Sequence, residues 1–335
     1  MAQPITEWRN VDTATFRNEI LPKGQPALLK GVVADWPVVR AAASGARALG
    51  DYIRKFDQGA PAEVIVGAPA IQGKMFYTLD MEALNFERRM GPFGAALETI
   101  FAHLNDAQPP TLYMGSSPVR ENFPGFAEAN RLDLLDDTVT PGIWIGNAVT
   151  VTTHFDASDN IACVVGGRRR FTLFPPEQLA NLYVGPLEFT PAGPPVSMVS
   201  LEAPDFARYP RFREALAVAQ AAELEPGDAL YIPYMWWHHV QSLSPFNVLV
   251  NYWWNDAKPG AGVPFEALVH AILAIRDLPP ERRENWRRMF DHYIFGDVED
   301  SVAHLAPPHR GILGDLTPMT AAKIRLFLQH VLNQS

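Results

Sequence analysis

The sequence predicts a mainly β protein with flanking helices. Seven short apolar runs between residues 111 and 254 alternate with turn residues, which is typical of a sandwich or barrel. The 30 prolines and 23 glycines are spread along the chain and divide it into many short elements. Beyond about residue 258 the apolar residues take the three- and four-residue spacing of helices. A length of 335 residues fits one core domain with additions.

The first hundred residues mix the two kinds of element. Apolar spacing predicts helices over residues 13–20, 49–56 and 93–104. Short apolar runs predict strands over residues 27–33, 63–66 and 74–77. We expect this part to be an addition to the core and not a domain of its own.

The β-rich part supplies the core. We expect strands over residues 111–114, 143–145, 149–154, 161–165, 170–174, 229–232 and 246–253. Turn residues separate them, among them the pairs Gly166-Gly167 and Pro175-Pro176. The stretch 179–225 is a long insertion with a helix expected over 211–222. The insertion and the first hundred residues would supply the walls of a substrate pocket.

The last part of the chain predicts helices over residues 265–275, 281–293 and 320–332. Its own apolar surface is small, so we expect it to pack on the core or on a second subunit. The sequence therefore divides into a domain at 1–257 and a helical region at 258–335, which is a candidate dimerisation element.

Composition limits the function. Lysine and arginine number 28 against 37 aspartates and glutamates, a formal charge of −9, so nucleic acid and anionic membranes are poor candidate partners. The first ten residues have no signal-peptide pattern and no apolar run approaches the roughly 20 residues of a membrane span, so we expect a cytoplasmic protein. The single cysteine, Cys163, can form neither an internal disulfide nor a thiolate cluster. Any metal site must use His, Asp or Glu.

One short motif carries such chemistry. His154 and Asp156 are two residues apart in an expected strand, so their side chains point to the same face. His238 or His239 offers a third ligand. Two histidines and one carboxylate on one face leave three coordination positions open, as in non-haem Fe(II) oxygenases. These positions would accept a bidentate co-substrate and then dioxygen.

Further motifs occur in a fixed order over most of the chain. They are 26–31 with Trp36-Pro37, 154–156, Asn160, Gly167, 174–176, 204–205, 209–210, 226–228, 231–233, 236–238 and 251–253. In this order and spacing the sequence resembles the JmjC-type subgroup of the cupin superfamily, the Fe(II)- and 2-oxoglutarate-dependent oxygenases. It is most similar to the cupin-like branch with the asparaginyl hydroxylase that acts on hypoxia-inducible factor. The resemblance implies a double-stranded β-helix core, also called a jelly roll or cupin.

The resemblance also implies the roles of individual residues. It selects His238 over His239 as the ligand beside His154 and Asp156. It gives Tyr113 and Arg169 to the far carboxylate of 2-oxoglutarate, with Arg169 in place of the lysine of the resembling hydroxylase. Strand alternation agrees, because Arg169 shares a face with apolar residues 171 and 173. The further site residues are Asn160 and Asn251 near the metal and co-substrate, Thr152 as a hydroxyl donor, and Trp253 and His239 as substrate contacts.

Two positions depart from the resembling hydroxylase. Val151 stands where that enzyme has a threonine three residues before the first histidine, so Thr152 is expected to supply the hydroxyl. Gly115 stands where it has a polar side chain that contacts the substrate. The substrate is therefore expected to differ.

The expected activity is hydroxylation of an unactivated C–H bond, on a peptide or protein side chain or on a small molecule. The cofactors would be Fe(II), 2-oxoglutarate and dioxygen, and demethylation would follow if the hydroxylated carbon were attached to nitrogen. Two alternatives remain: a metal-binding cupin whose reaction does not use 2-oxoglutarate, and a non-catalytic module with this fold. The resemblance further implies a homodimer formed through the C-terminal helices.

Overall fold

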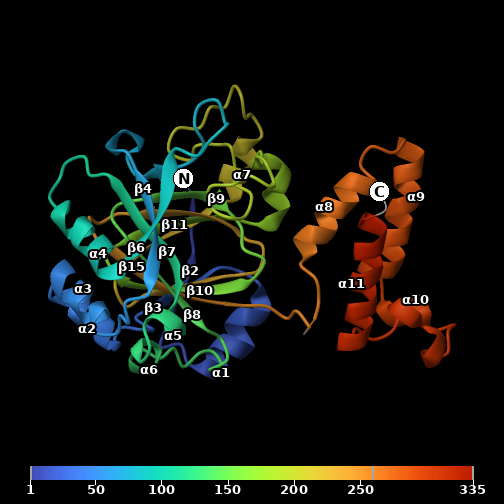
Figure 1. Cartoon of the computed structure of the whole chain (residues 1–335), viewed down its shortest axis with the longest axis horizontal. Helices are drawn as coiled ribbons and strands as arrows, with labels where there is room; N and C mark the ends of the chain where they lie inside the picture. Colours follow the sequence, from blue (N-terminus) through green and yellow to red (C-terminus); the bar gives the residue numbers. More distant parts are fainter. Residues whose placement is uncertain (1, 259, 334–335) are drawn as a thin grey trace. The chain divides into compact units, whose positions relative to one another are not determined.

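The computed structural model describes residues 2–258 and 260–333. The chain divides into two compact units, residues 1–255 and 256–335 (Figure 1). Within the described residues, every strand lies in the first unit and the second unit is helical. The first unit is built on two large β-sheets with a jelly-roll core, so the predicted fold class is confirmed.

The smaller sheet has six strands and carries most of the residues of the functional site. Its central strand pairs are antiparallel, as expected for a jelly roll. In spatial order the strands are β1 (Gln3–Pro4), β12 (Gln220–Leu224), β11 (Arg169–Phe174), β14 (Trp237–Ser242), β9 (Thr150–His154) and β5 (Lys74–Met75).

The larger sheet has nine strands and forms the opposite wall. Its order is β2 (Thr6–Arg9), β3 (Ala27–Lys30), β13 (Ala229–Ile232), β10 (Asp159–Gly166), β15 (Asn247–Trp254), β8 (Pro141–Gly146), β7 (Thr111–Pro118), β4 (Pro61–Gly67) and β6 (Phe86–Pro92). Strand β6 ends the sheet, beside β4.

Strand alternation separates two apolar cores. On β10, Ala162 and Val164 join Phe171 of the other sheet in the core between the sheets. Ile161 and Cys163 on the same strand point the other way, into the core under the N-terminal helices. Each fully buried Leu, Val or Phe contributes about 1.5–3 kcal/mol to folding. Strand β10 is therefore apolar from Ile161 to Val165, because both of its faces are covered there.

Helices cover the outer faces of both sheets. In Figure 1, α2 (Pro37–Ala43), α3 (Ala46–Arg54) and α4 (Phe93–Ala102) lie together on one side of the first unit. Helix α7 (Phe212–Val218) belongs to the insertion and packs Phe212 with Phe174 and Trp237 on the outer face of the smaller sheet. The remaining helices are short: α1 (Thr13–Thr15), which a π-helical segment continues (Phe16–Ile20), α5 (Val119–Asn122) and α6 (Phe126–Ala129).

The second unit contains α8 (Pro264–Ala274), α9 (Pro280–Phe290), α10 (Val298–Val302) and α11 (Pro318–Leu332). Three of these helices begin with proline, which suits the first helical position because no partner is needed for its missing N–H. Among the described residues, no helix combines the length and the apolar character needed to span a bilayer.

The predicted elements match the structure in type, with one exception in the insertion. The helix expected over 211–222 ends at Val218, because Ala219 is extended and the next residues form strand β12. Strand β12 lies between β1 and β11, so its main-chain hydrogen bonds to both neighbours override the local helical pattern. Patterning also missed helix α2 and strand β6.

Candidate metal centre

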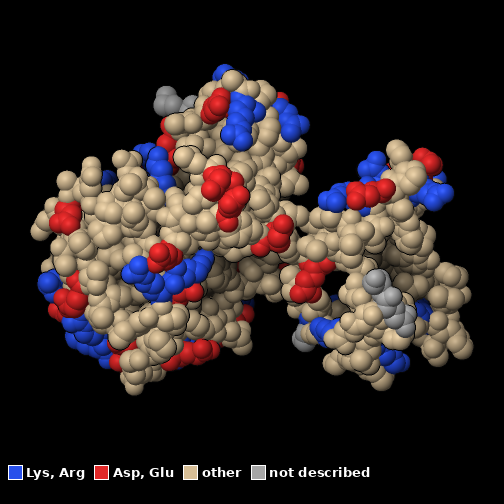
Figure 2. All heavy atoms as spheres, turned by 45° about the horizontal axis from the view of Figure 1, so that its top comes forward, with Lys and Arg blue, Asp and Glu red and all other residues tan. Residues whose placement is uncertain are grey.

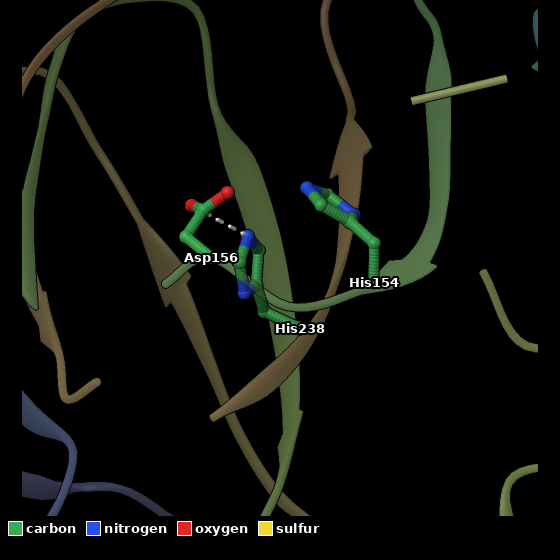
Figure 3. A group of neighbouring side chains, drawn as sticks. All are labelled: His154, Asp156 and His238. Atoms are coloured by element: carbon green, nitrogen blue, oxygen red, sulfur yellow. Dashed lines mark ion pairs between the residues drawn. The ribbon is translucent and has the colours of Figure 1, made fainter. Parts of the chain in front are cut away.

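Two neighbouring strands bring the expected triad together. His154 is the last residue of β9, Asp156 follows it in the connection to β10, and His238 lies on β14. His154 and His238 are directly opposite each other in the sheet, with ring centres 4.2 Å apart. One ligand atom from each of the three side chains lies within 4.8 Å of the others. Figure 3 shows the three side chains converging, with Asp156 beside His238.

The tautomer of both histidines follows from the hydrogen bonds that their Nδ1 atoms make to main-chain oxygens. The Nδ1–H of His154 donates to the main-chain oxygen of Thr152 at 2.8 Å. The Nδ1–H of His238 donates to the main-chain oxygen of Trp236 at 3.1 Å. Because a carbonyl oxygen can only accept, Nδ1 holds a proton, and in the neutral ring the lone pair is then on Nε2. Both rings can therefore offer Nε2 to a metal ion.

Burial also favours neutral imidazole. His154 is enclosed in the protein, and its desolvation, followed by the neighbouring charge of His238, lowers the pKa of His154 to about 4. At neutral pH the ring is unprotonated, as a ligand must be.

Asp156 is the most exposed of the three, with 20% of its side chain accessible against 5% for His238. Its Oδ2 lies 3.6 Å from Nε2 of His238 and accepts a hydrogen bond from the indole N–H of Trp253 at 3.0 Å. The main-chain N–H of Met235 donates to the main-chain oxygen of Asp156 at 3.0 Å. The main chain of Asp156 and its carboxylate are thus each held by one hydrogen bond from outside the triad.

A cavity of about 200 Å³ opens from the triad into the space between the sheets. Arg169 lines it and is 1% exposed, and its Nε and Nη2 atoms have no hydrogen-bond partner among the described residues. Burial lowers the pKa of Arg169, which the Tyr113 hydroxyl beside it partly offsets. Burial likewise raises the pKa of Tyr113, so the phenol is protonated at neutral pH. An orphaned, buried guanidinium is costly and indicates a site for an anion.

The remaining expected residues of the cavity form a hydrogen-bonded group. Asn251 donates from Nδ2 to Oδ1 of Asn160 at 3.4 Å, and its own Oδ1 accepts from the indole N–H of Trp144 at 2.7 Å. The Trp144 ring stacks on Tyr113 with centres 5.9 Å apart. Trp144 is not among the site residues predicted from the sequence. Strand alternation could have identified it: Ile143 and Ile145 point into the core under the N-terminal helices, so Trp144 between them points into the space between the sheets.

The expectation for Thr152 needs correction. Strand β9 has one extra residue relative to β14, because His154 pairs with His238 while Val151 pairs with Val240. The bulge reverses the alternation, so Val151 lines the cavity with His154. The Thr152 hydroxyl instead donates to the main-chain oxygen of Met75 at 3.0 Å. Thr152 therefore does not share the inward face that the prediction assumed.

His239 faces away from the triad and is 3% exposed. Its Nε2–H donates to Oε1 of Glu202 at 3.2 Å, and its Nδ1 accepts from the Thr153 hydroxyl at 3.3 Å. This placement on the outer face corrects the expectation of a substrate contact at His239. Trp253, the other expected substrate contact, does line the cavity, where its N–H is bonded to Asp156.

A second cavity of about 380 Å³ adjoins the first, and Tyr113, Trp144, Val151, His154 and Ala192 line both. Its outer wall contains Glu63 and Arg88, which are ion-paired at 2.5 Å. Gly115 also lines it, and a Cβ there would meet only the Trp144 ring, at 3.8 Å. The departure at Gly115 therefore leaves open space beside the triad.

Comparison with known proteins gives a family match to most of the chain. Residues 13–259 match the model of the cupin-like domain. This span contains all the residues of the triad and of both cavities.

Three relatives illustrate the range of similar proteins. The tRNA wybutosine-synthesizing protein 5 of Mus musculus is 25% identical over 85% of this chain and 93% of its own length. Lysine-specific demethylase JMJ31 of Arabidopsis thaliana is 34% identical over 40% of this chain, and HSPB1-associated protein 1 of Homo sapiens is 36% identical over 33%. The matched parts span only 23% and 22% of those two proteins.

Proposed function

The chain belongs to the cupin-like domain family, and from that premise we propose that it is an Fe(II)- and 2-oxoglutarate-dependent oxygenase. The reaction would hydroxylate an unactivated C–H bond of a peptide or protein side chain. One observation carries the proposal: the buried guanidinium of Arg169, with two nitrogen atoms unpartnered among the described residues, lines the same cavity as the triad of His154, Asp156 and His238.

The donor set fits iron. Two neutral imidazoles and one carboxylate are the ligands of the facial triad, and they leave room for a co-substrate and dioxygen. The described residues offer no cysteine near the triad, which argues against a thiolate metal site. His154, Asp156 and His238 would hold the ion.

The Arg169 guanidinium fits the far carboxylate of 2-oxoglutarate. Among the described residues no carboxylate pairs with Arg169, although the guanidinium is buried. A carboxylate would satisfy its free N–H groups with charge-assisted hydrogen bonds, which are worth about 1.5–3 kcal/mol each. The Tyr113 hydroxyl, beside the guanidinium, would donate to the same carboxylate.

The chain's own groups have distinct tasks in this reaction. Arg169 and Tyr113 bind one end of the co-substrate, and the amides of Asn160 and Asn251 orient groups between that end and the metal. The apolar walls, with Phe171 and Ile232, exclude water from the cavity. Iron(II) held by the triad would supply, with 2-oxoglutarate and dioxygen, the oxidising chemistry for hydroxylation, with succinate and carbon dioxide as the co-products.

The class of substrate follows from charge and from the second cavity. Figure 2 shows lysines and arginines interspersed with acidic side chains on the face drawn, and the net charge is −9. A peptide suits this surface better than a nucleic acid does. The second cavity is large enough for a side chain, and its wall offers a donor at Arg88 and an acceptor at Glu63.

A tRNA substrate is the second candidate. A relative named for tRNA modification matches 85% of this chain, and α9 carries four arginines, at 282, 283, 287 and 288. Titration of the protein into labelled total tRNA at two salt concentrations separates the candidates. Salt-sensitive binding that is lost when these arginines become glutamine would favour tRNA, and no binding would favour a peptide.

Anaerobic titration of the Fe(II)-loaded protein with 2-oxoglutarate tests the oxygenase site. The visible charge-transfer band of the chelate is expected in the native protein and absent in Asp156→Ala. In Arg169→Ala the band is expected to need about 10- to 100-fold more 2-oxoglutarate, because charge-assisted hydrogen bonds are lost.

Arg170→Ala is the matched control, since Arg170 is exposed on the other face of the same strand and pairs with Glu223. It is expected to titrate like the native protein. Bound iron without a band would favour a cupin with other chemistry, and a failure to bind iron would favour a non-catalytic module.

A further inference from the structure

We propose that Trp253 is a positioning residue of the metal centre: its indole N–H holds the carboxylate of Asp156 in the orientation that binds metal. The inference rests on the proposed function, because it takes the triad to be a metal site. It replaces the expected role of Trp253 as a substrate contact.

The three candidate ligands differ in whether the hydrogen bond that orients each side chain from outside the triad involves the main chain or another side chain. His154 and His238 each donate from Nδ1 to the main-chain oxygen of the residue two positions earlier in the chain. Asp156 is bonded by a side chain, that of Trp253, from a different strand. Outer partners of this kind orient metal ligands and tune their affinity. Of the three, only the bond to Asp156 can be removed by substituting one side chain.

The Asp156 carboxylate needs such a bond more than the histidines do. Asp156 lies in the connection between β9 and β10, outside both strands. Its main-chain oxygen is held by the N–H of Met235, but that bond does not restrict rotation of the carboxylate. The side chain is 20% exposed, so water competes for its oxygen atoms. The indole N–H of Trp253 holds Oδ2 of Asp156 beside His238 before metal binds. Metal binding then costs less side-chain conformational entropy.

Trp253 is itself held in place. It lies on β15, directly opposite Asn160 of β10. Its ring meets Trp144 edge to face, with centres 5.7 Å apart and planes at 86°. Trp144 is fixed by its hydrogen bond to Asn251 and by stacking on Tyr113. The donor that orients the carboxylate is therefore rigid, and it is continuous with the residues expected around 2-oxoglutarate.

The test measures metal affinity, so it needs no knowledge of the substrate. Calorimetric titration of the metal-free protein with Mn(II), a redox-stable probe, is compared for the native chain, Trp253→Phe and Trp254→Phe. Trp253→Phe keeps an aromatic ring and loses the N–H. We expect it to weaken Mn(II) binding by about 10- to 100-fold, as loss of an outer partner does in other metal sites.

Trp254→Phe is the matched control. Trp254 is the next residue, and its ring packs on Phe16 and Tyr231 instead of the triad. We expect its Mn(II) affinity to stay within about twofold of the native value. The thermal midpoint of each metal-free variant shows whether it is folded, and Trp253→His, which restores a ring N–H, is expected to recover part of the affinity.

The outcomes separate the inference from the proposed function. Equal Mn(II) affinity in the native chain and in a folded Trp253→Phe would overturn the positioning role and leave the oxygenase proposal standing. If the native chain bound no Mn(II), the proposed function itself would fail. Weaker binding in Trp253→Phe together with an equal loss in Trp254→Phe would indicate general loosening of β15 and would also overturn the inference.

Discussion

Arg169 shows how a single residue links sequence, energetics and site. Its position on β11 follows from alternation, and its guanidinium is buried with two nitrogen atoms unpartnered. A buried charge without a partner destabilises the fold. A buried cation of this kind suits the binding of an anionic ligand better than it suits stability, and this supports the proposed co-substrate site.

This cost gives a prediction about stability. Arg169→Met should stabilise the metal-free protein by about 1–2 kcal/mol, because the chain then buries an apolar group in place of an unpaired cation. It should also abolish the rise in thermal midpoint that 2-oxoglutarate gives the metal-loaded native protein. Denaturant unfolding of the metal-free proteins measures the first effect, and thermal unfolding of the metal-loaded proteins with and without 2-oxoglutarate measures the second. A less stable Arg169→Met would mean that the guanidinium has a structural partner.

Among elements, the insertion is tied to the strand that carries His238. Trp237 and His239 on the outer face of β14 contact the insertion, Trp237 through its packing with Phe212 and His239 through Glu202. The Nε2 of Gln241, also on β14, donates to the same oxygen of Glu202 at 3.1 Å. One strand thus offers a candidate metal ligand on its inner face and holds the insertion with its outer face.

The hydrogen bond between His239 and Glu202 predicts that the stability of the fold depends on pH. The hydrogen bond from His239 lowers the pKa of Glu202 to about 2, from 4.5 in an unfolded chain. A carboxyl with a depressed pKa stabilises the fold above its unfolded pKa, so this contribution is present above pH 4.5 and is lost as the pH falls from 4.5 toward 2. Glu202→Gln should cost about 1–2 kcal/mol at pH 7 and flatten the stability profile over that range.

Urea unfolding between pH 2 and 7 measures the effect. The control is Glu223→Gln, whose carboxylate pairs with Arg170 at the exposed face of the same sheet. Exposed pairs contribute about 0–1 kcal/mol, so this variant should follow the native profile closely. If Glu202→Gln and the native protein had the same free energy of unfolding at every pH, the stabilising role of the His239–Glu202 hydrogen bond would be contradicted.

For the whole molecule, the second unit predicts self-association. Large apolar side chains of its helices are exposed, among them Leu273, Trp286, Leu326 and Phe327. Among its described residues, only Ser301, Val302 and Ala321 are buried. An apolar surface of this kind favours burial against another protein surface, and we propose a second copy of this chain, as the sequence resemblance implies.

The proposed dimer is tested by measuring the molar mass with light scattering after gel filtration at several protein concentrations. The native chain should have the mass of a dimer, and Leu326→Glu combined with Phe327→Glu should shift it toward a monomer. Leu179→Glu, an equally exposed apolar position in the first unit, is the control and should remain dimeric. A monomeric native chain would rule out the proposal.

Much of the fold and the core of the site could be predicted from the sequence, because local patterns encode them. A continuous apolar run marks strand β10, and helical spacing marks α3, α4 and α8. The spacing of His154 and Asp156 and the motif around His238 are likewise local. The sequence by itself therefore determined the fold class, the pair of His154 and Asp156 with a third candidate ligand at His238 or His239, and the inward face of Arg169.

Tertiary structure decided what depends on partners distant in the chain. The bulge that turns Val151 inward exists only because β9 pairs with β14, almost ninety residues later. The hydrogen bond from Trp253 to Asp156 joins residues 97 positions apart in the chain, and the hydrogen bond from His239 to Glu202 joins residues 37 positions apart. Strand β12 replaced part of an expected helix because its neighbours supplied hydrogen bonds. The physical reason is common to all four: pairing register and side-chain contacts across sheets are fixed by the packed whole, whereas periodicity is fixed by neighbours in sequence.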